Sequence, residues 1–111
     1  MPYQFSEERE LAQLIDAPTN PQDQHRDINR ISGAIHARIW ANVPQRIYVK
    51  EYTIPLLERA HKMVLECARS DSSLQYIAET QERRIKNLYR YSRGEPSDFI
   101  SDESRKRIEL S

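Results

Sequence analysis

Apolar residues recur at spacings of three and four along most of this chain, which is the period of an amphipathic α-helix. The clearest stretch starts after Asp23 and carries one stripe of isoleucines that ends beside Trp40: Ile28, Ile31, Ile35 and Ile39. Isoleucine is a weak helix former, so a helix with this stripe depends on packing for its stability. We therefore predict that the stripe and Trp40 form the core of the protein or an oligomer interface.

A shorter helix is predicted over Ser6–Asp16. Ser6 can serve as its N-cap, and the two glutamates that follow it oppose the helix dipole. The prolines of the next segment interrupt the helical period, so we expect a loop at 17–21. The isoleucine helix that follows should end at Asn42–Pro44.

Residues 44–55 fit two kinds of structure. The β-branched and aromatic residues of Ile47–Val49 and Tyr52–Ile54 favour strands by propensity. Against this, Pro44 is suited to a helix start, and no second strand is available for pairing. We favour a helix that kinks or restarts at Thr53–Pro55.

Beyond Pro55 the pattern predicts another helix, which runs to about Ala68. The polar segment Ser70–Ser73 separates it from the longest and most regular helical run of the chain. That run should end at Gly94, because glycine is the usual residue at a helix C-cap.

Composition supports an all-α fold of about four helices, in a single domain over 1–111. The chain has two glycines, whereas sheets and phosphate-binding loops need several for turns with positive φ. Leu, Ile, Val and Phe number 24 of 111 residues, which is a thin core that favours burial of a face against another subunit. We expect a homo-oligomer. Residues 97–111 are interpreted as a short helix or flexible tail, with Phe99 and Ile100 as a small anchor.

Neither a membrane segment nor a secretion signal is visible. No apolar run approaches the length of a bilayer span, and the first residues lack the basic and apolar regions of a signal peptide. Cys67 is the single cysteine, so it cannot form an intramolecular disulfide, and its apolar helical context predicts a buried structural thiol. These features favour a cytoplasmic protein without membrane contact.

Residues that could support catalysis or metal binding are scattered. His25, His36 and His61 stand on different predicted segments, and none has a cysteine or a second histidine at a metal-ligand spacing. No glycine-framed nucleophile is present. We therefore expect no catalytic residue, no metal and no cofactor.

Arg30 and His36 form one pattern that resembles the arginine-to-histidine motif of the HEPN ribonucleases, which are small all-helical dimeric enzymes. The resemblance implies that these two residues act together in RNA cleavage. With 13 arginines and 3 histidines in the chain, about one such pair arises by chance. A helical ribonuclease is therefore the third of three functional hypotheses.

The candidate binding surface lies at the end of the longest predicted helix, where positive charges and tyrosines are interleaved: Arg83, Lys86, Tyr89, Arg90 and Arg93. Arginine with aromatic residues suits phosphate contact and base stacking, and it is equally typical of protein-binding hot spots. A solvated helix face gives the same pattern, since Glu79 and Glu82 stand one turn before Arg83 and Lys86. The net charge of zero disfavours a dedicated nucleic-acid binder.

The sequence thus favours a non-enzymatic protein-interaction module, such as a small regulator, inhibitor or assembly factor that acts by binding and occlusion. The expected partner is another copy of the chain or another protein. The alternative is a binder of nucleic acid or of a small anionic nucleotide through the cluster at 83–93.

Overall fold

The computed structural model describes residues 3–16 and 21–95, with backbone alone for residues 21–23. These ranges contain helices and no strand, in the order α1 (Ser6–Asp16), α2 (Pro21–Asn42), α3 (Arg46–Tyr48), a π turn (Val49–Thr53), α4 (Ile54–Ala68), a 3-10 turn (Ser72–Leu74) and α5 (Gln75–Ser92). The predicted all-α fold is confirmed. Nothing in the structure tests the predicted homo-oligomer, which stays a prediction.

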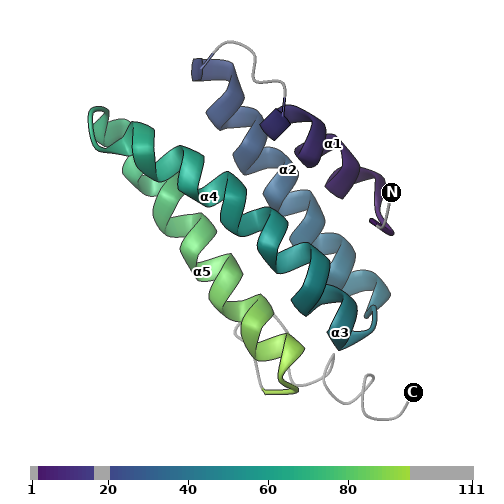
Figure 1. The fold of residues 1–111 in the computed structure, drawn as a ribbon. Helices are drawn as coiled ribbons and strands as arrows, with labels where there is room; N and C mark the ends of the chain where they lie inside the picture. The colour runs from purple at the N-terminus through teal and green to yellow at the C-terminus, as the bar shows by residue number, and fades with distance from the viewer. Residues whose placement is uncertain (1–2, 17–20, 96–111) are drawn as a thin grey trace.

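The four long helices run up and down in turn, as Figure 1 shows. α1 packs against α2 and α4 packs against α5, while α1 also contacts α4, and α2 contacts α5. α2 and α5 run in the same direction, so both end at the same end of the bundle (Figure 1). The turn between α2 and α3 lies at that end too.

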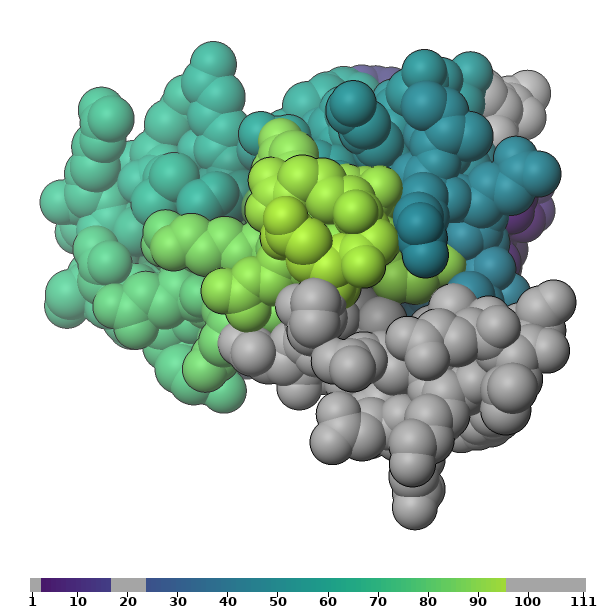
Figure 2. All heavy atoms as spheres, turned by 90° about the horizontal axis from the view of Figure 1, so that it is seen from below, coloured from purple at the N-terminus to yellow at the C-terminus, as the bar shows by residue number. Residues whose placement is uncertain are grey.

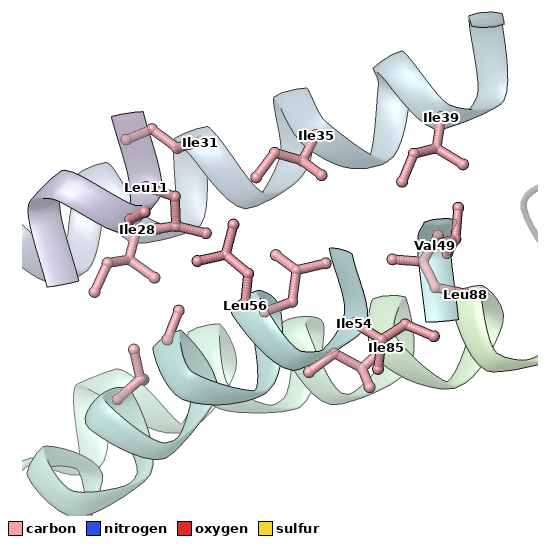
Figure 3. Packing of buried hydrophobic residues seen from close by; sticks show 14 of the residues in the cluster. Leu11, Ile28, Ile31, Ile35, Ile39, Val49, Ile54, Leu56, Ile85 and Leu88 are labelled. Carbon is pink, nitrogen blue, oxygen red and sulfur yellow. The ribbon is translucent and has the colours of Figure 1, made fainter. Parts of the chain in front are cut away.

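The predicted isoleucine stripe forms the centre of the core. Its four residues are between 0 and 2% exposed. Figure 3 shows them pointing from α2 toward Leu11 of α1 and toward apolar side chains of α4 and α5, among them Leu56 and Leu88. Burial of large apolar side chains on this scale is the main favourable contribution to folding.

Trp40 was predicted to lie in the core or in an oligomer interface; 41% of its surface is exposed, so it is not a core residue, and the interface stays a prediction. Ile39, the preceding residue, is fully buried. Successive residues of a helix are turned by about 100° around its axis, so Trp40 leaves the buried face.

Residues 46–68 form one helical run, which confirms the predicted helix and its restart before Pro55. The restart is the π turn, whose widened hydrogen bond joins the Ile54 N–H to the Val49 carbonyl. Pro55 explains it, because proline has no N–H and its ring collides with the carbonyl of Glu51, four residues earlier.

The helix starts differ slightly from the prediction. Ser6 is the first residue of α1 rather than its N-cap, and its hydroxyl donates to Glu7 at 3.1 Å. The carboxylate of Glu8 accepts instead from the backbone N–H of Phe5 at 3.4 Å, as in half of a capping box. α2 begins at Pro21 rather than after Asp23, since proline is well suited to the first turn of a helix.

The predicted limits of α5 are confirmed. Just before its start, Asp71 caps the 3-10 turn that leads into α5, accepting a hydrogen bond from the Ser73 N–H at 3.1 Å. At its end, Gly94 has φ 75°, and the Glu95 N–H donates to the Arg90 carbonyl at 2.8 Å. This is the Schellman motif, which glycine forms without steric cost.

Two predicted features fall outside the described residues: the loop at 17–20, and the short helix or tail at 97–111 with its anchor of Phe99 and Ile100. Pro21, predicted as the last loop residue, belongs to α2. Among the residues that are described, no helix combines the length and the apolar character needed to cross a bilayer.

Candidate functional site

The predicted cluster on α5 does not form one basic surface. Lys86 forms an ion pair with Glu82 at 3.1 Å, and Arg93 forms one with Glu95 at 3.2 Å. Tyr89 is half-buried, and its hydroxyl donates to a carboxylate of α4 at 2.8 Å. Exposed pairs contribute little to stability, but these two place a carboxylate beside Lys86 and beside Arg93.

A shallow hollow of about 220 Å³ lies along the outer side of α5, where Arg83, Lys86 and Arg90 share its wall with Glu79 and Glu82. The arginines could bind a phosphate here, because guanidinium groups match phosphate geometry. The two carboxylates oppose an anion in the same space. These five side chains leave the hollow with a net charge of 3 − 2 = +1.

Arg84, the remaining arginine of this run, points toward α2. Its guanidinium donates to the backbone carbonyl and the side-chain oxygen of Asn29, at 3.3 and 3.1 Å. Gly33 permits this approach, because a Cβ at that position would lie 3.2 Å from Arg84 Nη2. Burial, together with the positive charge of Arg84, lowers the pKa of His36 on α2 to about 4. The contact between α2 and α5 is thus polar in its middle.

The structure does not bring Arg30 and His36 together. Arg30 forms ion pairs with Glu10 of α1 at 3.4 Å and with Asp27 at 3.7 Å. His36 instead lies within the field of Arg84 on α5. Six helical positions correspond to a rotation of about 240°, so the two side chains leave α2 on different sides.

Large apolar side chains are exposed at the turn between α2 and α3. Trp40, Val43 and Ile47 expose 41, 39 and 54% of their surfaces, and we call these three residues the end patch. Figure 2 views this end of the bundle, where residues 40–50 lie beside the last turn of α5. Other large apolar residues with comparable exposure among the described residues stand in three separate elements: Tyr52, Leu65 and Tyr76. Apolar residues that gather at one exposed place mark interaction sites.

The backbone of the end patch is strained at Val43. It has φ 46° and is the sole non-glycine residue with positive φ in the described ranges. The left-handed region costs an L-residue about 1–2 kcal/mol, and β-branched residues avoid it most. Its N–H donates to the Ile39 carbonyl at 2.9 Å, which closes α2, and Pro44 prevents the helix from continuing. Strain of this kind is concentrated at functional sites.

Two contacts fasten the end of α5 to this turn. The Tyr91 hydroxyl donates to the Pro44 carbonyl at 2.6 Å. The Arg46 guanidinium packs against Gly94 so closely that a Cβ there would lie 2.8 Å from its Nη1. Both contacts hold the strained turn against a rigid helix.

Glu8 is a fully buried carboxylate that sequence reasoning missed. It accepts hydrogen bonds from the Tyr48 hydroxyl and, at 2.8 Å, from the Thr53 hydroxyl. Burial raises the pKa of Glu8, although the bonds from Tyr48 and Thr53 oppose this shift. The tyrosine hydroxyl in turn accepts from the Gln4 N–H at 2.6 Å. We call Glu8, Tyr48 and Thr53 the Glu8 cluster, which ties α1 to the π turn.

One sequence signal pointed to this role. Glu8 follows Phe5 by three positions, which is the spacing of a capping box, and Glu7 does not. Nothing local identifies Tyr48 and Thr53 as its partners.

His25 and Cys67, two of the residues considered for metal or thiol chemistry, lie at the other end of the bundle. No group of three His, Cys, Asp or Glu in the described part of the chain could hold a metal ion. Cys67 is half-buried rather than buried as predicted, because it stands in the last turn of α4. With His25 and Asp71 it lines an open pocket of about 460 Å³. Asp71 is engaged there as the cap of the 3-10 turn before α5.

The end patch is the candidate functional site. It unites exposed apolar surface, a strained backbone and a rigid support, and it includes Trp40, which the sequence placed at the end of the stripe. Val43 and Ile47 were missed, although a valine between Asn42 and Pro44 is an unusual helix ending. Comparisons of the chain with protein-family models, with curated proteins and with solved structures find no match.

Proposed function

We propose that this protein is a non-enzymatic interaction protein that binds another protein through the end patch. The observation that carries the proposal is the shared exposure of Trp40, Val43 and Ile47 at a single turn. Tryptophan is enriched among residues that dominate binding energy, and covering apolar surface contributes roughly 25 cal/mol per Å². Such a protein acts as a small regulator, inhibitor or assembly factor by occluding its partner.

The backbone of Val43 gives independent support. Glycine or asparagine would end α2 at lower cost than valine at φ 46°. The chain therefore has an apolar side chain at a position where glycine or asparagine would make the fold more stable. A binding role accounts for that choice.

The substitution Val43→Gly tests this role because it separates binding from stability. Glycine adopts a positive φ freely, so the free energy of unfolding should stay level or rise by up to about 1 kcal/mol. Loss of the exposed side chain should weaken partner binding. Urea unfolding gives the first quantity, and quantitative pull-down from cells of the source, compared with wild type, gives the second.

Leu65→Ser is the matched control. Leu65 is 42% exposed, much like Trp40, but it lies near the far end of α4. A partner should be retained by Leu65→Ser and lost with Ile47→Ser. Equal retention by both variants, or loss with both, would contradict the proposal.

The predicted homo-oligomer is one form of the same proposal, in which a second copy covers the end patch. In that case Ile47→Ser lowers the mass measured by sedimentation equilibrium, while Leu65→Ser leaves it unchanged. An oligomer that survives Ile47→Ser must be held together elsewhere.

The hollow on α5 supports a second candidate function, the binding of a small anionic nucleotide or of nucleic acid. Arg83, Lys86 and Arg90 supply the positive charge, and Glu79 and Glu82 oppose it. Titration of a fluorescent single-stranded oligonucleotide at several salt concentrations tests it. Affinity should fall steeply with salt, because phosphate contacts release counterions. An affinity that does not change with salt concentration, or that is unchanged in Arg83→Ala, rules this function out.

A further inference from the structure

The end patch lies beside the point where the described chain stops. Two contacts hold the last turn of α5 against the turn between α2 and α3: the Tyr91 hydroxyl donates to the Pro44 carbonyl, and the Arg46 guanidinium packs on Gly94. Sixteen residues, 96–111, continue the chain from Glu95. The last described residues lie near the end patch, because Gly94 contacts Arg46, the neighbour of Ile47.

These residues can reach the patch. Four residues span about 13 Å when extended, so Phe99 can extend from Glu95 across the Arg46 side chain to Ile47. Trp40 follows Gly33 by seven positions, which is two helical turns, and Gly33 lies directly against the guanidinium of Arg84 on α5. Trp40 therefore stands on the side of α2 that faces α5, the helix that leads to Glu95.

The chemistry of the two segments is complementary. The charged residues between positions 40 and 52 are Arg46, Lys50 and Glu51, all exposed, which gives 2 − 1 = +1. The segment 97–103 reads Ser-Asp-Phe-Ile-Ser-Asp-Glu, an apolar pair flanked by three carboxylates and no cation. An apolar surface with a positive border fits an apolar pair with a negative border.

We propose that residues 97–103 bind the end patch of their own chain, with Phe99 and Ile100 on the apolar surface and the flanking carboxylates toward Arg46 and Lys50. The segment acts as an internal ligand that an outside partner must displace. A tethered segment has an effective concentration on the order of millimolar, so a weak contact is sufficient for occupancy. This inference deepens the proposed function: an outside partner should present the same chemistry, an apolar pair flanked by carboxylates.

Trp40 is the only tryptophan, so its fluorescence reports on this surface without any label. The test compares the full chain with the double variant Phe99→Ser, Ile100→Ser. If the segment covers Trp40, the variant shows a red shift of the emission and a larger acrylamide quenching constant. The matched control is Ile108→Ser, Leu110→Ser, which removes two apolar residues of the same segment outside 97–103 and should leave both quantities at their wild-type values.

Three outcomes overturn the proposal. Identical fluorescence of wild type and the Phe99 and Ile100 variant means that the segment does not cover Trp40. Equal changes in both double variants mean that the contact is not made by residues 97–103. Protection of Trp40 that disappears on dilution means that a second copy supplies the cover. Circular dichroism verifies that the helices of each variant are intact.

Failure here is distinguishable from failure of the proposed function. The fluorescence test needs no partner, whereas the pull-down with Val43→Gly and Leu65→Ser needs no contact by residues 97–103. If both proposals hold, the Phe99 and Ile100 variant captures more partner than wild type, because the competing segment is gone. Equal capture by the two would overturn the competition while leaving the binding function in place.

Discussion

Two parts of the buried interior are filled in different ways. The stripe on α2 fills its part with isoleucine, and Ile35 is fully buried. The Glu8 cluster places a carboxylate, also fully buried, between α1 and the π turn. An apolar side chain needs only close contacts around it, whereas a carboxylate needs hydrogen-bond donors in fixed positions. Stability should therefore fall when a polar group is placed in the isoleucine stripe, and when a hydrogen-bond partner is removed from the Glu8 cluster.

The largest effect is expected from Ile35→Asp. The carboxylate would lie among isoleucines and leucines with no donor, so the free energy of unfolding should fall by more than about 4 kcal/mol. Circular dichroism and urea titration should show an unfolded or barely folded chain at neutral pH. A variant that stays folded and cooperative would mean that the stripe is not the centre of the core.

Glu8→Ala should have the next largest effect. It leaves the hydroxyls of Tyr48 and Thr53 without their acceptor and opens a cavity, so we expect a loss of about 2–4 kcal/mol. Glu8→Gln is the matched control, because its amide can accept from one hydroxyl and donate to the other. The free energies of unfolding of the two variants should differ by at least about 1 kcal/mol. Equal losses would show that the cluster contributes through volume alone.

The pH dependence of Glu8→Gln sharpens this result. Since burial raises the pKa of Glu8, the folded state favours the protonated carboxyl. That contribution is fully present below the unfolded pKa of about 4.3, and it is lost as the pH rises through the folded pKa. Compared with wild type, Glu8→Gln should therefore be relatively most stable at neutral pH. Urea midpoints of the two proteins across the acid range measure this difference.

His36 shifts stability with pH in the opposite direction. Its pKa falls from 6.5 to about 4 through burial and the charge of Arg84, so the folded state disfavours the protonated ring. Stability is complete above pH 6.5 and declines as the pH falls toward 4, by at most about 3 kcal/mol. His36→Gln cannot be protonated, so its free energy of unfolding should change less over this range. If the free energies of unfolding of the two proteins changed equally with pH, His36 would be exposed to solvent and its pKa would not be lowered by folding.

The comparison also explains what the sequence could predict. Periodicity alone identified the stripe of isoleucines. Gly94 located the end of α5, and Pro55 located a kink or restart, which the structure shows to be a π turn. Glu8 could not be predicted in the same way, because its partners stand 40 and 45 residues away. Helical period tells which face of a helix is buried, but not which neighbour faces it.

The same limit applies to the candidate sites. Arg84 belongs to the basic run of α5 by sequence. In the structure its guanidinium binds Asn29 on α2, because Gly33 leaves space for it there. The end patch depends on where α2 ends, since Ile39 is buried and Ile47, after the strained turn, is 54% exposed. Residue type did not distinguish these two isoleucines.

The smallest effect is expected from Ile47→Asp, the same substitution as Ile35→Asp at an exposed position. Little apolar packing is lost and the carboxylate stays in water, because Ile47 is 54% exposed, so the free energy of unfolding should change by less than about 0.5 kcal/mol. Urea unfolding of both variants, measured side by side, then separates burial from residue type. Partner capture should nevertheless drop with Ile47→Asp, since a charge now lies on the apolar surface. If Ile47→Asp destabilised the fold as Ile35→Asp does, the end patch would be part of the core and the proposed binding surface would not exist.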